Sequence, residues 1–352
     1  MTFKILSCGS NGSSQLGIGN ADDQDTLQTC SFETEEDKNT GHETLDSKPV
    51  KIKCGGNHTL VLLENGDCYS CGDNSNGQCG FKDPPDNISY FKRIPYMNNS
   101  KWVDIAAGWE FSLFLNDLSE LYVCGYGPNG ELGLGRHKSK SLELDPLSET
   151  SLLRLGFNFS YSIKSLMSSI HNCLVVCKNN DIYVWGNNKK GQFFDIKTEN
   201  NKLLKLIWEP QKMILDIDNI FNSVKFGLSR DFISILKFSK DNDKSSYSIE
   251  IKGKDNFNIQ KSVNDLQVTI DHEKNRLEIQ SMWSSIHIIA KKINNETLEN
   301  AVIGLQSFGN NSHGQLPSIQ DLSNYRITDI SVGSEHGLFI SKGDDGNNKV
   351  YA

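Results

Sequence analysis

The sequence has no long hydrophobic run, and this absence excludes one class of protein. No stretch of its 352 residues approaches the roughly 20 consecutive apolar residues that a membrane-spanning helix needs. The N-terminal segment MTFKILSCGSNGS also lacks the apolar run of about 7 to 15 residues found in a secretory signal. We therefore expect a cytoplasmic protein that has no membrane partner.

Clusters of basic residues are also missing. The chain has 36 Lys and Arg against 44 Asp and Glu, which gives a formal net charge of -8. Because binding to a phosphate backbone needs several clustered cations, we expect no direct nucleic-acid partner. Acidic residues gather instead between Ala21 and Asp46, where nine of them accompany a single Lys. We interpret residues 21–48 as a solvated acidic insertion loop, and a contact for a basic partner is the alternative.

The nine cysteines lack the pattern of a metal site. Most of them lie in apolar strand patterns, where Cys behaves as a small hydrophobic residue in a reducing compartment. Cys68 and Cys71 have C-x-x-C spacing, but no second pair follows to complete four ligands. In an extended strand, residues three apart point to opposite faces. We expect both residues in the core, and neither a metal nor a cofactor in this chain.

What the sequence does contain is a repeat. A glycine-rich loop motif recurs with starts 53 to 67 residues apart. Self-similarity at such a period indicates a repeat architecture. The clear copies are GSNGSSQLG from Gly9, GDNSNGQCG from Gly72, GYGPNGELG from Gly125 and GNNSHGQLP from Gly309, and weaker copies start at Gly186 and Gly253.

Two strands precede the loop motif in each clear repeat. The strand next to the motif is short and alternating or apolar, as in DCYSC and ELYVC. An earlier, inner strand begins after small residues, as in CGGNHTLVLL and AAGWEFSLFL, and a polar turn such as ENGD separates the two. This is the chemistry of a β-hairpin. One repeat is therefore predicted to be a hairpin followed by the loop.

The glycines of the repeat have a structural explanation. Glycine lets neighbouring backbones approach and permits a positive φ. The Asn and Gln amides of the motif can bond to their own loop, and its Leu can enter the core. No Lys-Ser/Thr follows the motif and we expect no helix to begin there, so we do not interpret the loops as phosphate sites. The glycines given this structural role are Gly9, Gly17, Gly55, Gly72, Gly77, Gly80, Gly108, Gly125, Gly130, Gly133, Gly186, Gly191, Gly309, Gly314 and Gly333.

The number of strands predicts the fold class. Repeats of this kind form a β-propeller, which usually closes by pairing its first strand with its last. Residues 3–8 form an outer strand with no inner strand before it, and six inner strands follow. We expect an all-β, seven-bladed β-propeller as a single domain over residues 1–352. The spacing of the repeats predicts that its C-terminus is truncated by about 40 to 50 residues, before the last blade is complete, and a closed six-bladed ring is the alternative.

These loop and strand motifs resemble the RCC1 family, whose members fold as seven-bladed propellers, and the resemblance covers nearly all of the chain. The loop motif close to Met1, the segment LGIGNADDQDT and the decayed middle copies resemble a fungal branch of that family. The resemblance implies a non-catalytic scaffold that forms a heterodimer with a small CSL-type zinc protein. It also implies support of diphthamide modification of elongation factor 2 and of Elongator-dependent modification of tRNA wobble uridines, in the cytoplasm and also in the nucleus.

The founding member of the family implies a different function, guanine-nucleotide exchange on a small GTPase. Propeller loops would carry out such exchange without covalent chemistry on the propeller. A catalytic propeller would need a convergent set of acid, base or nucleophile side chains, and none recurs in the sequence. We therefore expect no enzyme and no catalytic residue. Scaffold and exchange factor use one fold, so the motifs leave both open.

Candidate contact residues lie in the loops that lead into the inner strands. Trp109 and Trp283 occupy equivalent positions there, and Trp buries a large area at a small entropic cost. Glu110, Arg230 and Glu335 lie in equivalent loops and would add charge to the same face. We predict that these five residues bind a protein partner, and burial of the two tryptophans in the core is the alternative.

Two histidines begin inner strands in the same pattern. His58 and His336 occupy a position that holds Phe111 and Asn172 in other repeats. A position that accepts His, Phe and Asn indicates packing or bonding to the loop rather than a ligand.

Overall fold

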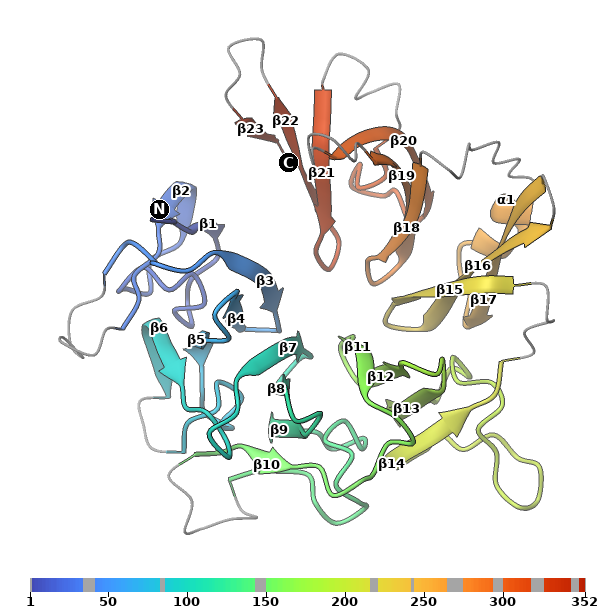
Figure 1. Cartoon of the computed structure of the whole chain (residues 1–352), viewed down its shortest axis with the longest axis horizontal. Coiled ribbons are helices and arrows are strands. Elements are labelled where there is room, and N and C mark those ends of the chain that lie inside the picture. The colour runs from blue at the N-terminus through green and yellow to red at the C-terminus, as the bar shows by residue number, and fades with distance from the viewer. Residues whose placement is uncertain are drawn as a thin grey trace. The chain divides into compact units, whose positions relative to one another are not determined.

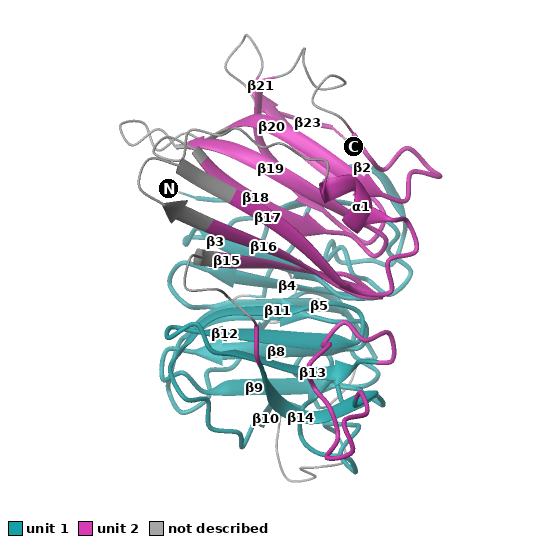
Figure 2. Cartoon of the chain, turned by 90° about the vertical axis from the view of Figure 1, so that its right-hand side faces the viewer, with its two compact units in different colours: residues 1–188, 204–213 teal, residues 189–203, 214–352 magenta. Residues whose placement is uncertain are grey.

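The structure is a computed structural model that describes residues 2–33, 42–82, 86–142, 150–215, 221–241, 244–264, 275–293, 300–317, 326–342 and 348–351. These residues form β-strands and one short helix (Figure 1). The chain divides into two compact units: unit 1 contains residues 1–188 and 204–213, and unit 2 contains residues 189–203 and 214–352 (Figure 2). Within the described ranges, no helix is long and apolar enough to cross a membrane.

Unit 1 contains four antiparallel sheets in its described residues. They follow the chain in the orders β1-β2, β3-β4-β5-β6, β7-β8-β9-β10 and β11-β12-β13-β14. The strands are β1 (Leu6–Gly9), β2 (Gln24–Thr29), β3 (Pro49–Cys54), β4 (His58–Leu63), β5 (Cys68–Asp73), β6 (Asn87–Ile94), β7 (Trp102–Ala107), β8 (Phe111–Asn116), β9 (Leu121–Gly125), β10 (Leu153–Arg154), β11 (Ile163–Ser168), β12 (Asn172–Cys177), β13 (Ile182–Asn187) and β14 (Leu206–Met213).

The predicted hairpin is the centre of a four-stranded sheet. In the second sheet, β4 and β5 pair from His58 opposite Gly72 to Leu62 opposite Cys68. β3 pairs with the other edge of β4, and β6 with the other edge of β5. The residues that precede and follow the hairpin motif therefore complete each blade.

The central strands are buried on both faces. Leu60 and Leu62 of β4 belong to one hydrophobic cluster, whereas Val61 and Leu63 belong to another. Successive side chains of a strand point to opposite faces, so a nearly continuous apolar run fits a strand with a core on each side. The sheet therefore separates two hydrophobic cores.

This alternation also separates the two cysteines of the C-x-x-C segment. Cys68 packs in the cluster of Leu60 and Leu62, and Cys71 packs in the cluster of Val61 and Leu63. The prediction that they point to opposite faces of a strand and lie in the core is confirmed.

The first strands of successive sheets are linked by a carboxylate. β3, β7 and β11 each shift register near their beginning, between Trp102 and Asp104 in the case of β7. Asp104 follows this β-bulge and forms an ion pair with Lys51 of β3. Its other oxygen accepts the N–H of Leu166 in β11 at 3.1 Å. One side chain thus connects three consecutive sheets, and the bulge directs it between them.

Unit 2 contains three antiparallel sheets, each of three strands, in its described residues. Their orders are β15-β16-β17, β18-β19-β20 and β21-β22-β23. The elements are β15 (Phe221–Leu228), β16 (Phe232–Asp241), β17 (Lys244–Gly253), α1 (Ile259–Asn264), β18 (Asn275–Ser281), β19 (Ser285–Ile293), β20 (Asn300–Gly309), β21 (Arg326–Val332), β22 (Gly337–Lys342) and β23 (Asn348–Tyr351). The predicted outer strand at Val350 and Tyr351 is confirmed, because β23 pairs with β22.

The expectation that no helix begins at a loop motif is wrong for the weak copy that starts at Gly253. Here the carboxylate of Asp255 accepts the N–H groups of Ile259 and Gln260, each at 2.9 Å. These bonds cap the N-terminus of α1, whose Ile259 and Val263 are buried. A capping carboxylate and two apolar residues one turn apart are sufficient to turn the decayed motif into a helix.

The acidic segment at residues 21–48 is not a loop throughout. Gln24–Thr29 form β2, which pairs antiparallel with β1. Residues 34–41 lie outside the described residues.

Candidate functional site

Every complete hairpin begins with the same tight turn. Between the first and second strands of a sheet, one backbone hydrogen bond encloses two residues, and we call these two residues the first turn of that sheet. In the sheet of β7 and β8, the N–H of Gly108 donates to the carbonyl of Phe111 at 2.9 Å, and Trp109 and Glu110 are the two residues between them. The same bond joins Gly55 to His58, Ser169 to Asn172, Ser229 to Phe232, Met282 to Ser285, and Gly333 to His336. The side chains of the two residues between these bonded positions differ from turn to turn.

In every copy of the loop motif except the one at Gly9, the first glycine packs against the backbone of a first turn. Gly125 has a φ of 103°, and a Cβ atom on it would lie 2.2 Å from the carbonyl oxygen of Glu110. The next residue, Tyr126, donates its N–H to that same oxygen at 2.8 Å. The arrangement recurs at Gly72, Gly186, Gly253 and Gly309, which have φ values of 106°, 99°, 110° and 129°. Only glycine combines this φ with so close an approach.

The polar residues of the motif fold the loop onto itself. The side chain of Asn74 accepts the N–H of Cys79 at 3.1 Å and donates to the carbonyl of Phe81 at 3.0 Å. The Gln78 side chain accepts the N–H of Asn76 at 2.9 Å. Asn11 and Gln15 repeat these contacts in the first copy. The predicted role of these amides is confirmed, and the motif residues Leu16 and Leu132 are buried as predicted.

The outer end of the motif joins one sheet to the next. The carbonyl of Gln78 accepts the hydroxyl of Ser112 at 2.7 Å and the thiol of Cys124 at 3.4 Å, both from the following sheet. The carbonyls of Gln15 and Glu131 are used in the same way, by Thr59 and Cys71 and by Cys173 and Trp185. In unit 1, these carbonyls of the recurrent loop therefore already bind side chains of the following sheet.

The cysteines of unit 1 fit this structural use. Burial raises the pKa of Cys124 to about 12 and raises the pKa values of Cys71, Cys79 and Cys173 well above the ordinary range. A thiol that stays protonated is a poor nucleophile and a poor metal ligand. Among the described residues, no group of three or more His, Cys, Asp or Glu side chains could hold a metal ion.

His58 occupies a packing position, as predicted. Its Nε2 contacts the Ser112 hydroxyl at 2.8 Å, and because that hydroxyl donates to Gln78, the imidazole must donate from Nε2. Burial lowers the pKa of His58 to about 4, so the ring is neutral. Gly55 leaves space for the ring, since a Cβ atom there would lie 2.1 Å from it.

Backbone bonds place neighbouring first turns side by side. The N–H of Gly56 donates to the carbonyl of Trp109 at 2.9 Å, and the N–H of Trp109 donates to the carbonyl of Ile170 at 3.1 Å. In unit 2, Trp283 makes the equivalent bond to Ser334 at 2.8 Å. The first turns joined in this way form a continuous face within each unit.

The two predicted tryptophans differ in exposure. Trp109 is 40% exposed, and its indole packs on Gly56, where a Cβ atom would lie 3.0 Å from the ring. Trp283 is half-buried. Neither side chain lies in the core, so core burial does not explain either residue.

The predicted charged residues lie in first turns of both units. Glu110 is half-buried in unit 1. In unit 2, Arg230 lies 3.6 Å from the carboxylate of Asp231, and Glu335 accepts the Ser284 hydroxyl at 2.8 Å. The structure thus places Trp109 and Glu110 in one turn of unit 1 and the other three residues in separate turns of unit 2.

Sequence reasoning missed a carboxylate of a loop motif that contacts a first turn. Glu131 stands where most copies of the motif have Gln, and it is 1% exposed. Its carboxylate lies 3.0 Å from Nδ1 of His171, which occupies the first turn of the next sheet. The change from Gln to Glu in GELG was the only signal in the sequence.

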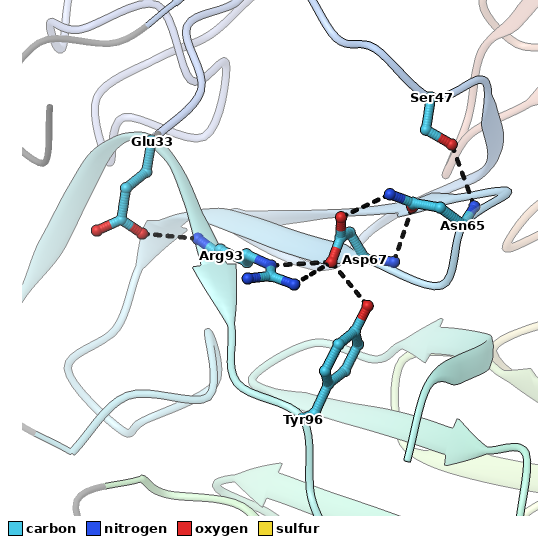
Figure 3. A network of polar contacts seen from close by, with 6 residues as sticks. All are labelled: Glu33, Ser47, Asn65, Asp67, Arg93 and Tyr96. Atoms are coloured by element: carbon cyan, nitrogen blue, oxygen red, sulfur yellow. Dashed lines mark hydrogen bonds and ion pairs between the residues drawn. The ribbon is translucent and has the colours of Figure 1, made fainter. Parts of the chain in front are cut away.

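The opposite ends of the same strands carry a different set of carboxylates. Asp67 receives hydrogen bonds from Arg93, from the Tyr96 hydroxyl at 2.8 Å and from Asn65 at 2.7 Å (Figure 3). Burial alone would raise the pKa of Asp67, but the hydrogen bonds from Tyr96 and Arg93 outweigh it and lower the pKa. Glu33 completes the group by accepting the backbone N–H of Arg93 at 3.0 Å.

This pairing repeats in the next two sheets. Glu120 pairs with Arg154 at 3.0 Å, and Asp181 pairs with Lys212 at 2.8 Å. In each case an acidic residue just before the third strand meets a cation on the fourth strand. These carboxylates thus connect the fourth strand of each of these sheets to the start of the third strand in unit 1.

Comparison with known proteins identifies the repeat. Models of the regulator of chromosome condensation (RCC1) repeat match residues 50–78 and 65–115. The chain is 34% identical over 197 residues to an RCC1 repeat-containing protein of Schizosaccharomyces pombe, with 53% of this chain and 50% of that protein covered. It is 29% identical over 204 residues to the human RCC1-like G exchanging factor-like protein, with 53% and 39% covered. The chain thus spans about half or less of the length of these curated relatives.

A solved structure extends the similarity to the fold. The crystal structure of human WBSCR16 matches with a TM-score of 0.66 at 19% identity, and the match covers 96% of this chain and 82% of that one. The predicted all-β, RCC1-like β-propeller fold is confirmed. The chain carries the RCC1 repeat at residues 50–115 and is similar over about half of its length to RCC1 repeat-containing proteins.

Proposed function

We propose that this protein is a non-catalytic, protein-binding scaffold whose first turns carry the contact face. The observation that supports the proposal most directly is Trp109, a large aromatic side chain that is 40% exposed on a turn fixed by backbone bonds on both sides. An aromatic ring that is rigid before binding loses little entropy when a partner covers it. The loop motifs at Gln15, Gln78 and Glu131 in unit 1, in contrast, already bind groups of neighbouring sheets.

The proposed partner is a small CSL-type zinc protein. This part of the proposal rests on the resemblance of the motifs and of the segment LGIGNADDQDT to the fungal RCC1-like protein known as the α-tubulin suppressor and killer-toxin-insensitivity protein. The heterodimer would support diphthamide modification of elongation factor 2 and Elongator-dependent modification of tRNA wobble uridines. The zinc would belong to the partner, and the pair would act in the cytoplasm and the nucleus.

A second candidate is guanine-nucleotide exchange on a small GTPase. Two relatives carry names that favour it: the human RCC1-like G exchanging factor-like protein, and a bovine secretion-regulating guanine nucleotide exchange factor that is 28% identical over 53% of this chain. Exchange would use the same first turns to hold a GTPase in its nucleotide-free state.

Affinity purification of the full-length protein distinguishes the two candidates. Recovery of a zinc-binding protein of under about 100 residues, which then forms a 1:1 complex when both proteins are purified, would support the scaffold. A GTPase that is retained most tightly without nucleotide, and released by GTP, would replace the scaffold by the exchange factor.

The binding face is tested on the reconstituted complex. Trp109→Ala should weaken it at least tenfold, whereas Tyr161→Ala, which removes an aromatic residue that is 58% exposed outside the first turns, should leave it unchanged. If both variants bound the partner with equal affinity, the contact would lie outside the first turns.

A further inference from the structure

We infer that Trp109 and Glu110 receive a cationic side chain, Arg or Lys, that projects from the protein partner. The inference rests on the proposed scaffold function and specifies the chemistry of its contact. It uses three features of unit 1: an exposed indole held in place, a carboxylate on the next residue of the same turn without a cation among the described residues, and the pairing of carboxylates elsewhere in the same unit.

The indole is held before any partner arrives. The carbonyl and the N–H of Trp109 are both bonded to neighbouring first turns, to Gly56 and to Ile170. Gly56 also provides a flat surface on which the ring packs, because it has no side chain. The ring is therefore presented at 40% exposure with little freedom to turn away. The face of an indole attracts cations more strongly than other aromatic side chains do.

The adjacent carboxylate is available for the same ligand. Glu110 is the second residue of this two-residue turn, and Gly125 and Tyr126 fix its carbonyl. Among the residues that the structure describes, its carboxylate makes no hydrogen bond or ion pair. Asp73, which donates its N–H to the carbonyl of Asn57 in the preceding first turn, has a carboxylate that accepts only the N–H of Ser75 among the described residues.

The carboxylates at the opposite ends of the strands differ from Glu110 in that they are paired with cations. There, each of the carboxylates of Asp67, Glu120 and Asp181 has a cation from the fourth strand. In unit 1, the acidic residues that connect the third and fourth strands of a sheet are thus each paired with a cation. Glu110 and Asp73 lie at the end that presents the exposed tryptophan, and they have no such partner among the described residues. A cation supplied by another protein would be complementary to both the ring and the carboxylates.

Arg and Lys are favoured over other occupants by this geometry. A purely apolar side chain would cover the indole but would remove water from Glu110 without replacing its hydrogen bonds. An acidic side chain would be repelled. A guanidinium can stack on the ring and bond to the carboxylate at the same time, so we expect Arg to bind better than Lys.

A short peptide tests this chemistry on the full-length chain. The probe is Ac-Gly-Arg-Gly-Arg-Gly-NH2, and its control is the same peptide with citrulline, which has nearly the shape of Arg but no charge. The chain has five tryptophans, so a 15N-labelled sample gives five indole N–H signals. The signal that Trp109→Phe removes should shift with the Arg peptide at millimolar concentration and not with the citrulline peptide.

Variants separate the two parts of the receptor. Trp109→Phe keeps a ring on Gly56 and should weaken peptide binding about threefold, and Glu110→Gln should weaken it about fivefold and remove most of its salt dependence. Glu64→Gln, which neutralises an exposed carboxylate at the other end of the hairpin of β4 and β5, is the matched control and should bind as the parent protein does. Equal shifts with both peptides, or equal binding by Glu110→Gln and the parent protein, would overturn the inference.

These experiments distinguish a failure of the cation receptor from a failure of the scaffold proposal. If a partner binds and Trp109→Ala weakens it, but Glu110→Gln and the citrulline peptide change nothing, the scaffold stands and the cation receptor fails. If the Arg peptide binds at Trp109 while no protein of the proposed kind is recovered, the receptor stands and the partner is wrong.

Discussion

At the scale of single residues, Gly125 shows how closely a loop motif and a first turn depend on each other. We expect Gly125→Ala to lower the free energy of unfolding by about 2–4 kcal/mol, because alanine disfavours a φ of 103° and its Cβ would lie 2.2 Å from the Glu110 carbonyl. The same change should shift the Trp109 indole signal, since the clash falls on the turn that carries it. Urea unfolding and the NMR spectrum measure the two effects.

A second glycine provides the control for this prediction. Gly12 lies in another copy of the motif and is exposed, and a Cβ atom on it would meet nothing within 4 Å. Gly12→Ala should therefore change the stability by less than about 0.5 kcal/mol. Similar losses for both variants would mean that glycine is needed for chain flexibility rather than for the approach to the turn.

The sequence predicts the type of such residues better than their contacts. The role of the motif glycines follows from their recurrence, yet Ser14 and Asn258 occupy the position of Gly77 with φ values of 63° and 53°. The recurrent constraint there is a left-handed backbone, which glycine satisfies most easily. The exposure of Trp109 could not be predicted, because it depends on Gly56, which is distant in sequence and reaches it only through a contact between sheets.

At the scale of elements, α1 covers the edge of β17 with one side chain. The Gln260 amide accepts the N–H of Ile251 and donates to the carbonyl of Ile249 at 3.0 Å, which are the bonds that a neighbouring strand would make. Gln260→Ala should lower the free energy of unfolding by about 1–2 kcal/mol and speed hydrogen exchange at Ile251. Gln306→Ala, at an exposed Gln of β20, should change neither. Unchanged protection at Ile251 would show that the edge is covered by something other than Gln260.

The central strands can be predicted from the sequence and the outer strands cannot, and the difference has a physical reason. β4, β5, β8 and β9 are buried on both faces, so their composition is apolar and their hairpins are easily recognised. β6 and β14 are edge strands with mixed polarity, and their cations Arg93 and Lys212 pair with carboxylates that are distant in sequence. Nothing within such a segment indicates which edge it joins.

At the scale of the whole molecule, burial of neutral histidine in both units predicts sensitivity to acid. Burial lowers the pKa values of His58 and His287 from 6.5 to about 4. A group whose pKa is lower in the folded protein binds protons more strongly in the unfolded chain, so stability falls as the pH drops below 6.5. Between pH 7 and pH 4.5, each histidine should lower the free energy of unfolding by about 2 kcal/mol. Urea unfolding at the two pH values measures the sum.

The repeat itself supplies the substitutions that test this prediction. His58 is equivalent to Phe111, and His287 is equivalent to Leu60 and Leu113, so His58→Phe and His287→Leu place a side chain that the fold already accepts. Each should make the loss between pH 7 and pH 4.5 smaller by about 2 kcal/mol, while His137→Gln, at an exposed position, should not. The carboxylates of Asp67 and Glu120 interfere little, because their pKa values are lowered from 3.8 and 4.5 and most of their contribution is lost only below pH 4.5. An acid sensitivity that persists undiminished in the double variant would assign it to groups other than these two histidines.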